Sequence, residues 1–563
     1  MAVSVIPEAL PLVITLSLSR GALRLAKQHV VVKRLSSIED LGSIDVLCTD
    51  KTGTITENSL KVMNTRAADS RQCLLQAVLA SAYLGEAVRD QNNAFDLALW
   101  QAADQALKNE ALGYHKLGER PFDPSRRRNS VIVQTNAIRS LIVRGAAESV
   151  LPLCPQANIQ TELQFAAAEG RRGRRVIAVA GRSVTADESE PAEQNLELVG
   201  QISFVDPLKS DTIEAVRAAQ RLGVAIKVLT GDAPEVAGAV AQEVGIVKRA
   251  ESVLTDNEFN ALNAVEQAEA VEKFQVFARL SPEAKHRILK LLQVRHTVGF
   301  LGEGFNDAPA LKSAHVALAV DRASEVAKDA ADVVLIDRGL MTIINGIEEG
   351  RRIFANTVKY IKNTLTSNFG NFYAIALVSL IIPFLPMLPI QILFVNLLSD
   401  FPMIAVATDS VERAELRRPR RYEIKEIALI ATFLGLVSTL FDFTFFAFFQ
   451  HSGEATLQTL WFIESILTEL ALIYSIRTHG LFFRGLKPSR PLVGFSIAAV
   501  LITVGLPFLS FGQRFFHFIQ PNLGQLALVL GIVAVYFVTT EIVKLVYYRM
   551  TTDHDKSAAP QAS

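Results

Sequence analysis

The sequence predicts a Rossmann-like α/β domain that carries an inserted α+β domain and is joined to a bundle of transmembrane helices. Three observations predict this arrangement: short apolar runs that end in glycine and carboxylate residues, a change of composition over residues 60–205, and a strongly apolar region beyond residue 350. A chain of 563 residues is too long for a single hydrophobic core. Basic and acidic residues number 57 each, so no global charge points to nucleic acid, and we expect no nucleic-acid partner.

The first apolar stretch, residues 1–19, is interrupted by Pro7, Glu8 and Pro11. A complete spanning helix needs about 20 apolar residues. No basic segment precedes the stretch, as one would in a secretory signal. We therefore expect residues 1–19 to form part of a transmembrane helix.

The α/β domain is predicted to be discontinuous, with parts at 20–59 and 206–345 on either side of the 60–205 insertion. Ile44–Cys48 is an apolar run of the kind that forms a buried parallel strand, and Asp50–Thr54 follows it closely. Strand-like runs resume after residue 206 and again end in glycine and carboxylate residues. Because parallel sheets place their chemistry at the carboxyl ends of strands, we expect these residues to meet there.

Six membrane spans are predicted within residues 346–552, ahead of a disordered tail at 553–563. Their ranges are 358–385, 389–408, 427–449, 458–476, 491–511 and 525–547. Arginine and lysine concentrate in the loops 411–426 and 477–490, and basic loops stay on the cytoplasmic side. We expect a multi-pass plasma-membrane protein whose α/β domains and C-terminus lie in the cytoplasm.

Asp50 is the predicted nucleophile for the γ-phosphoryl group of ATP. An aspartate that attacks phosphate needs a magnesium ion to neutralise charge and donors to hold the transferred oxygens. Thr52 lies two residues on, and Gly53 permits close backbone approach. The alternative is that Asp50 caps a helix in a surface turn. The remaining expected groups are the phosphate donors Thr230 and Gly231, the cation Lys285, and the metal-holding Glu303 and Asp307, which with Asp50 and Thr52 form the expected metal set.

These motifs resemble those of the P-type ATPases, a family of the haloacid dehalogenase-like superfamily. Asp50–Thr56 resembles the family's phosphorylation motif, and Thr230–Asp232 and Asp206–Pro207 resemble its phosphorylation-domain loops. Lys285 resembles the catalytic lysine. Gly302–Leu311 resembles the hinge motif, except that Glu303 replaces an aspartate that normally binds magnesium. The resemblance adds Lys51, Asp232 and Asn306 to the expected catalytic residues.

The same resemblance makes residues 60–205 a nucleotide-binding domain. Phe122 resembles the aromatic residue that stacks on adenine, and Arg144–Gly145 stands where the family usually has Lys-Gly. Arg175 resembles an arginine that contacts the phosphates, and Asp206 is included in the expected nucleotide site. Without the resemblance, Phe122 would be read as core and Arg175 as a solvated charge. The run Arg126–Arg128 is interpreted as a solvated face or phosphate neighbourhood.

Polar groups at membrane depth are the candidates for a transported-ion site, because such groups are costly in lipid. We expect this site to contain Glu8, Asn368, Asn371, Asn396 and Asp400. Four further acids are either secondary ligands or helix-packing groups, namely Asp442, Glu464, Glu469 and Glu541. Carboxylate, amide and backbone oxygens suit a hard cation such as Mg²⁺, Ca²⁺, Na⁺ or H⁺ rather than copper or zinc.

Within the family, the chain is most similar to bacterial magnesium-transporting ATPases. The resemblance rests on Pro7–Pro11, Ser367–Asn371, Phe384–Pro389 and Asn396–Asp400. The run Phe401–Ala405 departs from that subfamily, so proton and calcium transport remain alternatives.

We do not recognise the family's actuator domain and first three spans in this sequence. We expect either a fragment of a pump or a chain whose actuator domain is supplied by a separate partner. Related phosphatases place an acid two residues after the nucleophile, where this chain has Thr52, so a phosphoenzyme should hydrolyse slowly. Two rival hypotheses are a membrane-anchored phosphatase and a non-catalytic membrane partner of an intact pump.

Overall fold

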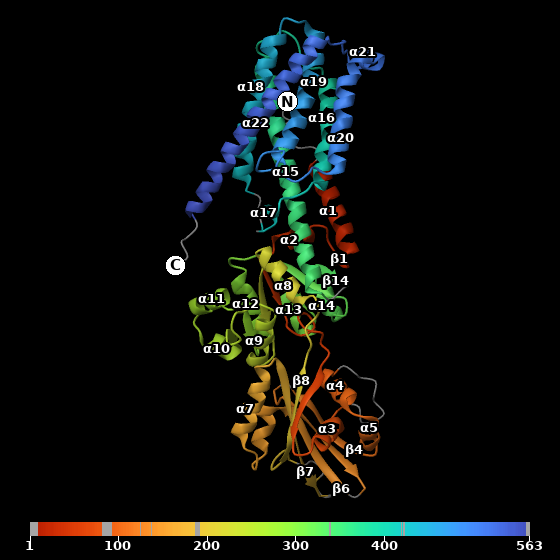
Figure 1. Cartoon of the computed structure of the whole chain (residues 1–563), viewed down its shortest axis with the longest axis vertical. Coiled ribbons are helices and arrows are strands. Elements are labelled where there is room, and N and C mark those ends of the chain that lie inside the picture. Colours follow the sequence, from red (N-terminus) through yellow and green to blue (C-terminus); the bar gives the residue numbers. More distant parts are fainter. Residues whose placement is uncertain are drawn as a thin grey trace. The chain divides into compact units, whose positions relative to one another are not determined.

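The computed structural model describes residues 10–81, 93–123, 125–136, 138–185, 188, 192–336, 339–417, 419 and 423–558. The chain forms two compact units. The helical unit comprises residues 1–28, 32–43 and 346–563, and the sheet unit comprises residues 29–31 and 44–345. The sheet unit holds two separate β-sheets, and the helical unit holds the long apolar helices (Figure 1). The predicted fold class is confirmed.

The first sheet has the strand order β1-β14-β13-β12-β2-β9-β11-β10. Its strands are β1 (Val30–Val32), β2 (Val46–Thr49), β9 (Ala225–Leu229), β10 (Val253–Thr255), β11 (Val276–Ala278), β12 (Val298–Gly302), β13 (Val316–Val320) and β14 (Val333–Leu335). The pairs from β14 to β10 are parallel. All residues of β2 and β12 are buried, as expected of strands covered on both faces.

The register of the first sheet brings three strand ends together. Thr49 at the end of β2 pairs with Leu301 of β12 on one side and with Val228 of β9 on the other. The residues that follow β2, β9 and β12 therefore emerge at one edge of the sheet. In the sheet, β2 is flanked by β9, β11 and β10 on one side and by β12, β13 and β14 on the other. Such a point is where open α/β sheets bind ligands.

Helices of the first sheet connect its strands. They are α8 (Thr212–Arg221), α9 (Pro234–Glu243), α10 (Asp256–Ala261), α11 (Ala264–Lys273), α12 (Pro282–Leu292), α13 (Ala308–Ser313) and α14 (Glu325–Ala330), with the 3₁₀ turn η3 (Phe305–Asp307). Helix α12 begins with proline at its first position, and the Ser281 hydroxyl accepts a hydrogen bond from the Ala284 amide. This cap fixes the first turn, from which Lys285 projects.

The second sheet is antiparallel, with the order β3-β8-β7-β6-β5-β4. Its strands are β3 (Lys61–Ala67), β4 (His115–Asp123), β5 (Arg128–Thr135), β6 (Ile138–Ala146), β7 (Arg174–Val184) and β8 (Glu197–Val205). The helices around it are α3 (Ser70–Leu79), α4 (Ala94–Ala102), α5 (Gln105–Leu112), α6 (Ala147–Val150) and α7 (Ile159–Gly170), with the 3₁₀ turn η2 (Leu151–Leu153). Alternate residues enter two hydrophobic clusters, with Ile142 in one and Leu141 and Val143 in the other. The sheet is therefore covered on both faces.

Asp206 joins the two ends of the inserted segment. Its carboxylate accepts hydrogen bonds from the Thr56 hydroxyl at 2.6 Å and from the Ser59 amide at 3.2 Å. Thr56 also forms a β-bridge with Leu208. The chain thus leaves for the second sheet and returns from it at one place, directly beyond the Asp50 loop.

The helical unit contains α1 (Leu10–Lys27), α2 (Ser37–Ser43), most of α15 (Leu340–Val378), α16 (Pro389–Ala405), α17 (Arg413–Leu416), α18 (Ile424–Phe449), α19 (Glu454–Ile476), α20 (Arg490–Gly505), α21 (Ser510–Phe515) and α22 (Leu523–Ala558). The short 3₁₀ turns η4 (Val406–Thr408) and η5 (Leu506–Phe508) follow α16 and α20. Helix α1 continues to Lys27 rather than ending at residue 19. Helix α22 extends into the 553–563 range that was predicted as a tail.

Five helices in the described part of the chain are long and apolar enough to cross a membrane. They span Pro389–Thr408, Ile424–Phe449, Glu454–Ile476, Arg490–Phe508 and Leu523–Met550. The remaining predicted span, 358–385, stays a prediction: it falls in α15, which ends at Val378 and is not among the five. Buried polar side chains between Lys359 and Ser367 lower the apolar character of this helix.

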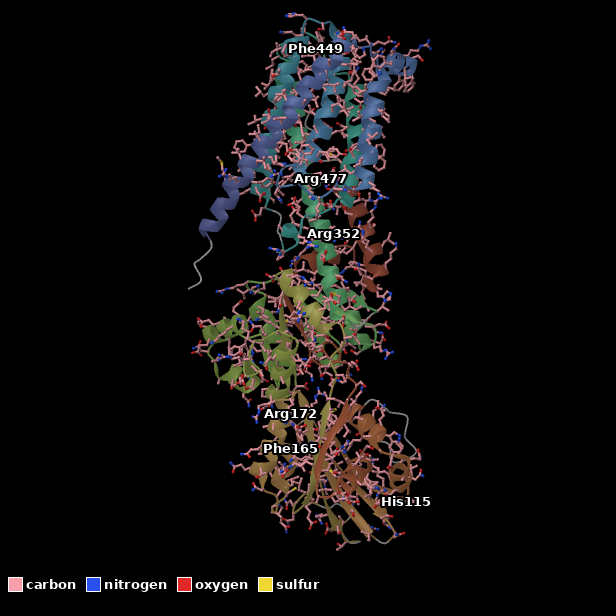
Figure 2. All side chains as sticks on the ribbon, viewed as in Figure 1. His115, Phe165, Arg172, Arg352, Phe449 and Arg477 are labelled. Carbon is pink, nitrogen blue, oxygen red and sulfur yellow. The ribbon has the colours of Figure 1, made fainter. Side chains whose placement is uncertain are left out.

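Helix α19 is the most enclosed of the five. Of its most apolar window, 89% is buried, against 28–50% in the other four. It packs on α16, α18, α20 and α22. Phe449 and Arg477 lie at opposite ends of this bundle (Figure 2). The Arg477 guanidinium pairs with the buried Asp409 carboxylate, with Nε 3.0 Å from Oδ2.

We predict that Gly200→Ala destabilises the sheet unit. A Cβ at residue 200 would lie 2.5 Å from Ala67 Cβ and 2.7 Å from the Arg66 carbonyl oxygen, so backbone must shift. We expect a loss of about 1–3 kcal/mol, as is usual for overpacking. Thermal unfolding followed with a thiol-reactive dye measures this, because Cys48, Cys73 and Cys154 are all buried in this unit.

Gly118→Ala, in the same sheet, is the matched control. Its Cβ would meet only Ile132 Cδ1 at 3.5 Å, an ordinary contact. Equal unfolding temperatures for the two variants would contradict the steric explanation.

His296 should make the stability of the sheet unit depend on pH. Its ring nitrogens lie 3.1 Å from Asp45 Oδ2 and 2.9 Å from Glu272 Oε2. Partial burial lowers the pKa of His296, but the two carboxylates outweigh it and hold the pKa above 6.5. The stabilisation is therefore complete below pH 6.5 and is lost as the pH rises through the raised pKa.

We predict that the difference in unfolding temperature between the wild type and His296→Gln is largest below pH 6.5 and shrinks above it. The exposed His115 provides the control variant His115→Gln (Figure 2). A difference for His296→Gln that does not depend on pH would exclude stabilisation by a charged His296 between Asp45 and Glu272.

Candidate functional site

Asp50 lies immediately after β2, at the edge where the three strand ends meet. Its Oδ1 accepts a hydrogen bond from the Lys51 amide at 2.6 Å, and its Oδ2 accepts one from Lys285 Nζ at 2.8 Å. Its side chain is 25% exposed. The carboxylate is thus oriented by two donors and is still open to solvent.

Lys285 bridges Asp50 and Asp307. Its Nζ also donates to Asp307 Oδ1 at 3.1 Å, while Asp307 Oδ2 accepts from the Glu303 and Gly304 amides, each at 3.2 Å. Burial lowers the pKa of Lys285, but the two carboxylates outweigh it and raise the pKa above its ordinary value. Lys285 therefore carries a positive charge beside Asp50.

A second ion-pair group surrounds Asp232. Lys51 is 2% exposed, and its Nζ lies 2.5 Å from Asp232 Oδ2. Arg175, from β7 of the second sheet, donates to both oxygens of Asp232 at 2.6 and 2.8 Å and to the Thr52 hydroxyl at 2.8 Å. Burial raises the pKa of Asp232, but Lys51 and Arg175 outweigh it and lower the pKa below its ordinary value.

Thr230 and Gly231 form the turn after β9. The buried Thr230 hydroxyl accepts a hydrogen bond from the Asp232 amide at 3.2 Å, so the turn closes on itself. A Cβ on Gly231 would meet no atom within 4 Å. Open space therefore lies beside this residue. Asn306 is exposed in η3.

Glu303 lies against the loop that follows Asp50. Gly53 has a φ of +81°, and a Cβ there would lie 2.5 Å from Glu303 Oε2. The Thr54 hydroxyl donates to Glu303 Oε1 at 3.5 Å. Lys209 Nζ donates to the Gly53 carbonyl oxygen from the other part of the first sheet domain. The positive φ favours glycine at position 53, and a side chain there would displace the Glu303 carboxylate.

The oxygen donors around Asp50 fit a hard cation in chemical type, since Asp50, Thr52 and Glu303 supply carboxylate and hydroxyl oxygens. Glu303 reaches the loop only because Gly53 has no side chain. Asp307, by contrast, is already occupied by Lys285 and two backbone amides. In the described part of the chain, no three His, Cys, Asp or Glu side chains are grouped to hold a metal.

A cavity of about 1130 Å³ lies in the sheet unit between the two sheets, beside Gly231 and Asp232. Its volume is ample for a nucleotide, since ligand pockets span roughly 300–1,000 Å³. Phe122, which is 59% exposed, Gly145 and Arg175 line it. The structure therefore brings four of the five predicted nucleotide residues to one cavity, the fourth being Arg144. Asp206 is instead bound to Thr56 and Ser59.

Arg144 lines the cavity, but its guanidinium is already bound. Its nitrogens lie 2.5 Å from Asp96 Oδ1, 3.3 Å from Asn129 Oδ1 and 3.2 Å from the Ala77 carbonyl oxygen. Asp96 and Asn129 also line the cavity and were missed by sequence reasoning. The signal that the sequence offers for Asp96 is an acid within the otherwise apolar run Ala94–Leu99.

The Arg126–Arg128 run is held by two glutamates. Arg126 and Arg128 pair with Glu193 at 3.0 and 2.7 Å, and Arg127 pairs with Glu148 at 3.2 Å. Glu148 also pairs with Arg279 of the first sheet domain at 3.1 Å. Of the three, Arg127 lines the cavity, as does Arg279.

The predicted ion-site residues are only partly assembled in the helical unit. Asn371 Nδ2 donates to Glu469 Oε1 at 2.9 Å, and Asp400 lies within electrostatic reach of Glu469. Asn368 is half-buried and Asn396 is exposed. Glu8 lies outside the described residues. Glu469, predicted only as a secondary ligand or packing group, is thus the side chain on which the predicted amide and acid converge.

Glu541 is bound by three hydrogen-bond donors from its own helix and from the end of α19 and the loop that follows it. It accepts hydrogen bonds from Lys544 Nζ and the Ser475 hydroxyl, each at 2.6 Å, and from the Phe482 amide at 3.1 Å. These contacts tie α22 to the end of α19, which supports the packing alternative for this acid.

Two family models match the chain. The haloacid dehalogenase-like hydrolase model matches residues 44–315, and the model of the cation-transporting ATPase C-terminus matches residues 384–546. The first match covers the strands and loops around Asp50, and the second covers the five apolar helices. Together with the relatives below, they show that the chain belongs to the P-type ATPase family.

Curated relatives include the magnesium-transporting ATPase, P-type 1, of Escherichia coli (strain K12), which is 35% identical over 98% of this chain and 64% of its own length. The protein of the same name from Salmonella typhimurium (strain LT2) is 34% identical over 98% of this chain and 63% of its own length. The calcium-transporting ATPase of Bacillus subtilis (strain 168) is 28% identical over 95% of this chain and 67% of its own length. The chain therefore spans less than two thirds of the length of the magnesium-transporting relatives.

We predict that Asp232→Asn strongly destabilises the sheet unit, because it leaves the buried Lys51 ammonium without a charged partner. Loss of one member of a buried ion pair costs about 3–5 kcal/mol. Chemical denaturation of the wild type and the variant measures the change. Glu110→Gln, which breaks the exposed Arg71–Glu110 pair, is the control and should change stability little. An equally small change for both variants would contradict a structural role for the Asp232 group.

Proposed function

We propose that this chain carries out ATP-driven cation transport through an aspartyl phosphate on Asp50, and that the transported cation is Mg²⁺. The observation that carries this proposal is the position of Asp50, at the meeting point of three strand ends, beside a charged lysine and near a nucleotide-sized cavity. We place the protein in the plasma membrane as a multi-pass protein.

In the proposed phosphoryl transfer, a carboxylate oxygen of Asp50 attacks the γ-phosphorus of ATP. An acyl-phosphate O–P bond forms, the bond to the β-phosphate oxygen breaks, and ADP leaves with that electron pair. Lys285 offsets negative charge at Asp50 throughout. The Thr52 hydroxyl and the backbone of Thr230 and Gly231 are the donors for the transferred oxygens.

Mg²⁺ bound by Asp50, Thr52 and Glu303 would neutralise charge on the phosphoryl oxygens. Asp307 then has a positioning role, because it holds Lys285 and the Glu303 amide in place. Asn306 and Lys51 complete the proposed catalytic group, with Lys51 acting through Asp232.

ATP is proposed to occupy the cavity with its base on Phe122 and its phosphates toward Arg175 and Gly231. Phe122 is exposed, as a stacking platform must be. Arg175 already reaches the Thr52 hydroxyl, so it can join the second sheet to the phosphoryl-transfer loop. Arg144 is proposed to orient Asp96 and Asn129 in the cavity wall.

For the transported cation, the proposed ligands are oxygen donors in the helical unit. Asn371, Asp400 and Glu469 lie together, and Glu8, Asn368 and Asn396 complete the proposed set. Oxygen ligands of this type suit Mg²⁺. The magnesium-transporting relatives support this choice over calcium or protons.

Thr52 cannot serve as the acid or base that a phosphatase uses to hydrolyse its phosphoenzyme. We propose that discharge of the aspartyl phosphate depends on a group outside those described, with a separate actuator chain as one source.

The decisive experiment is labelling of the purified chain in lipid with [γ-³²P]ATP and magnesium. We expect acid-stable, hydroxylamine-sensitive label that is absent in Asp50→Asn and that decays slowly in an unlabelled chase. Glu269→Gln, at an exposed acid on α11, is the control and should label normally. Label that persists in Asp50→Asn would overturn the assignment, and rapid decay would overturn the proposed role of Thr52.

Titrating the labelling with Mg²⁺, Ca²⁺ and pH tests the choice of cation. If the amount of label responds to Ca²⁺ or to pH and not to Mg²⁺, then Ca²⁺ or H⁺ replaces Mg²⁺ as the proposed transported ion.

A further inference from the structure

Helices α18 and α19 bury three acids in the middle of the helical unit. Asp442 is 4% exposed, Glu464 is 1% exposed and Glu469 is 7% exposed. Each has a buried carboxylate oxygen without a hydrogen-bond partner, namely Asp442 Oδ2, Glu464 Oε2 and Glu469 Oε2. Glu469 belongs to the proposed cation ligands. Asp442 and Glu464 are not used by the proposed mechanism.

Among the described residues, no cation is found to act on Asp442 or Glu464. Trp461 Nε1 donates to Asp442 Oδ1 at 2.8 Å, and Trp461 is one turn before Glu464 on α19. The described titratable groups that act on the pair are Glu469 on the same helix and Tyr536 on α22, an acid and a phenol. Asp400 on α16 faces Glu469 rather than the pair.

Two ionised carboxylates in such a place would be very costly. Burial at membrane depth penalises each charge, and a second like charge nearby penalises it further. A proton on one acid removes a charge and turns one oxygen of that carboxyl group from an acceptor into a donor. The unpartnered oxygens thus point to a bound proton.

A metal ion is a poorer occupant of this position. Mg²⁺ requires near-octahedral coordination by about six oxygens. Among the described residues, no three acids, histidines or cysteines are grouped closely enough to hold a metal.

We propose that Asp442 and Glu464 form a proton-binding pair at the centre of the helical unit, separate from the cation ligands, and that its proton is exchanged with water during the transport cycle. The exchange of this proton during transport rests on the proposed function. A carboxylic acid releases H⁺ to water and a carboxylate takes it up again, so each exchange moves one positive charge opposite to the cation. The pair would thereby reduce the net charge moved per transported ion.

Infrared spectroscopy of the chain in lipid tests proton binding without requiring transport. At neutral pH, we expect the C=O stretching band of a protonated carboxyl group in the wild type. The band should be lost or reduced by about half or more in Asp442→Asn and in Glu464→Gln, which keep the shape and polarity of the side chains. Glu454→Gln, at an exposed acid at the start of α19, should leave the band unchanged. Absence of the band, or a band that survives in both variants, would overturn the proposal.

Proton exchange is tested in vesicles by measuring cation uptake and internal pH together. Both variants should retain cation uptake but move at least twofold fewer protons per cation than the wild type and Glu454→Gln. An unchanged proton-to-cation ratio would overturn the exchange role. If the wild type takes up no cation, the proposed function and the exchange role fall together, whereas the carboxyl band still decides whether the pair holds a proton.

Discussion

The contact of the Lys285 ammonium with Asp50 is the interaction on which the proposed phosphoryl-transfer site depends. Lys285 stands on α12 and Asp50 follows β2, two segments 235 positions apart in the chain. The same ammonium holds Asp307, whose other oxygen binds the Glu303 and Gly304 amides. One buried cation on α12 therefore holds two loops together, the Asp50 loop and the loop of residues 303–307. Asp307 is buried and Asp50 is partly exposed, so loss of Lys285 would leave at least one buried carboxylate without its cation.

A second group of charges ties the two sheets of the sheet unit together. Asp232 belongs to the first sheet domain, and Arg175 comes from the second. Arg175 also reaches Thr52, two residues from the nucleophile. Glu148 and Arg279 make a further link at the cavity rim. A nucleotide that draws Arg175 toward its phosphates would therefore act on the same contacts that hold the two sheets, which is a physical route from binding to closure.

The helical unit solves a different electrostatic problem. Its enclosed helix α19 carries acids where the solvent around the bundle would be hydrocarbon, so every charge there needs a ligand or a proton. Glu469 has the Asn371 amide as a partner, and Asp442 has the Trp461 indole. Glu541 has the Lys544 ammonium. Glu469, Asp442 and Glu541 thus accept hydrogen bonds from an amide, an indole and an ammonium. This difference distinguishes the proposed cation ligand, the proposed proton-binding pair and a packing contact.

The sequence alone determined the fold class, the discontinuous α/β domain, five of the membrane-type helices and the Asp50 loop. Apolar periodicity and short motifs are local properties, and a strand that ends in Asp-Lys-Thr-Gly-Thr keeps its chemistry wherever the chain leads. Only the tertiary structure decided which side chains bind each other. It paired Arg144 with Asp96, Asp206 with Thr56 and Asn371 with Glu469. Those outcomes depend on which distant segments pack together, and no local pattern records the burial and neighbouring charge that result.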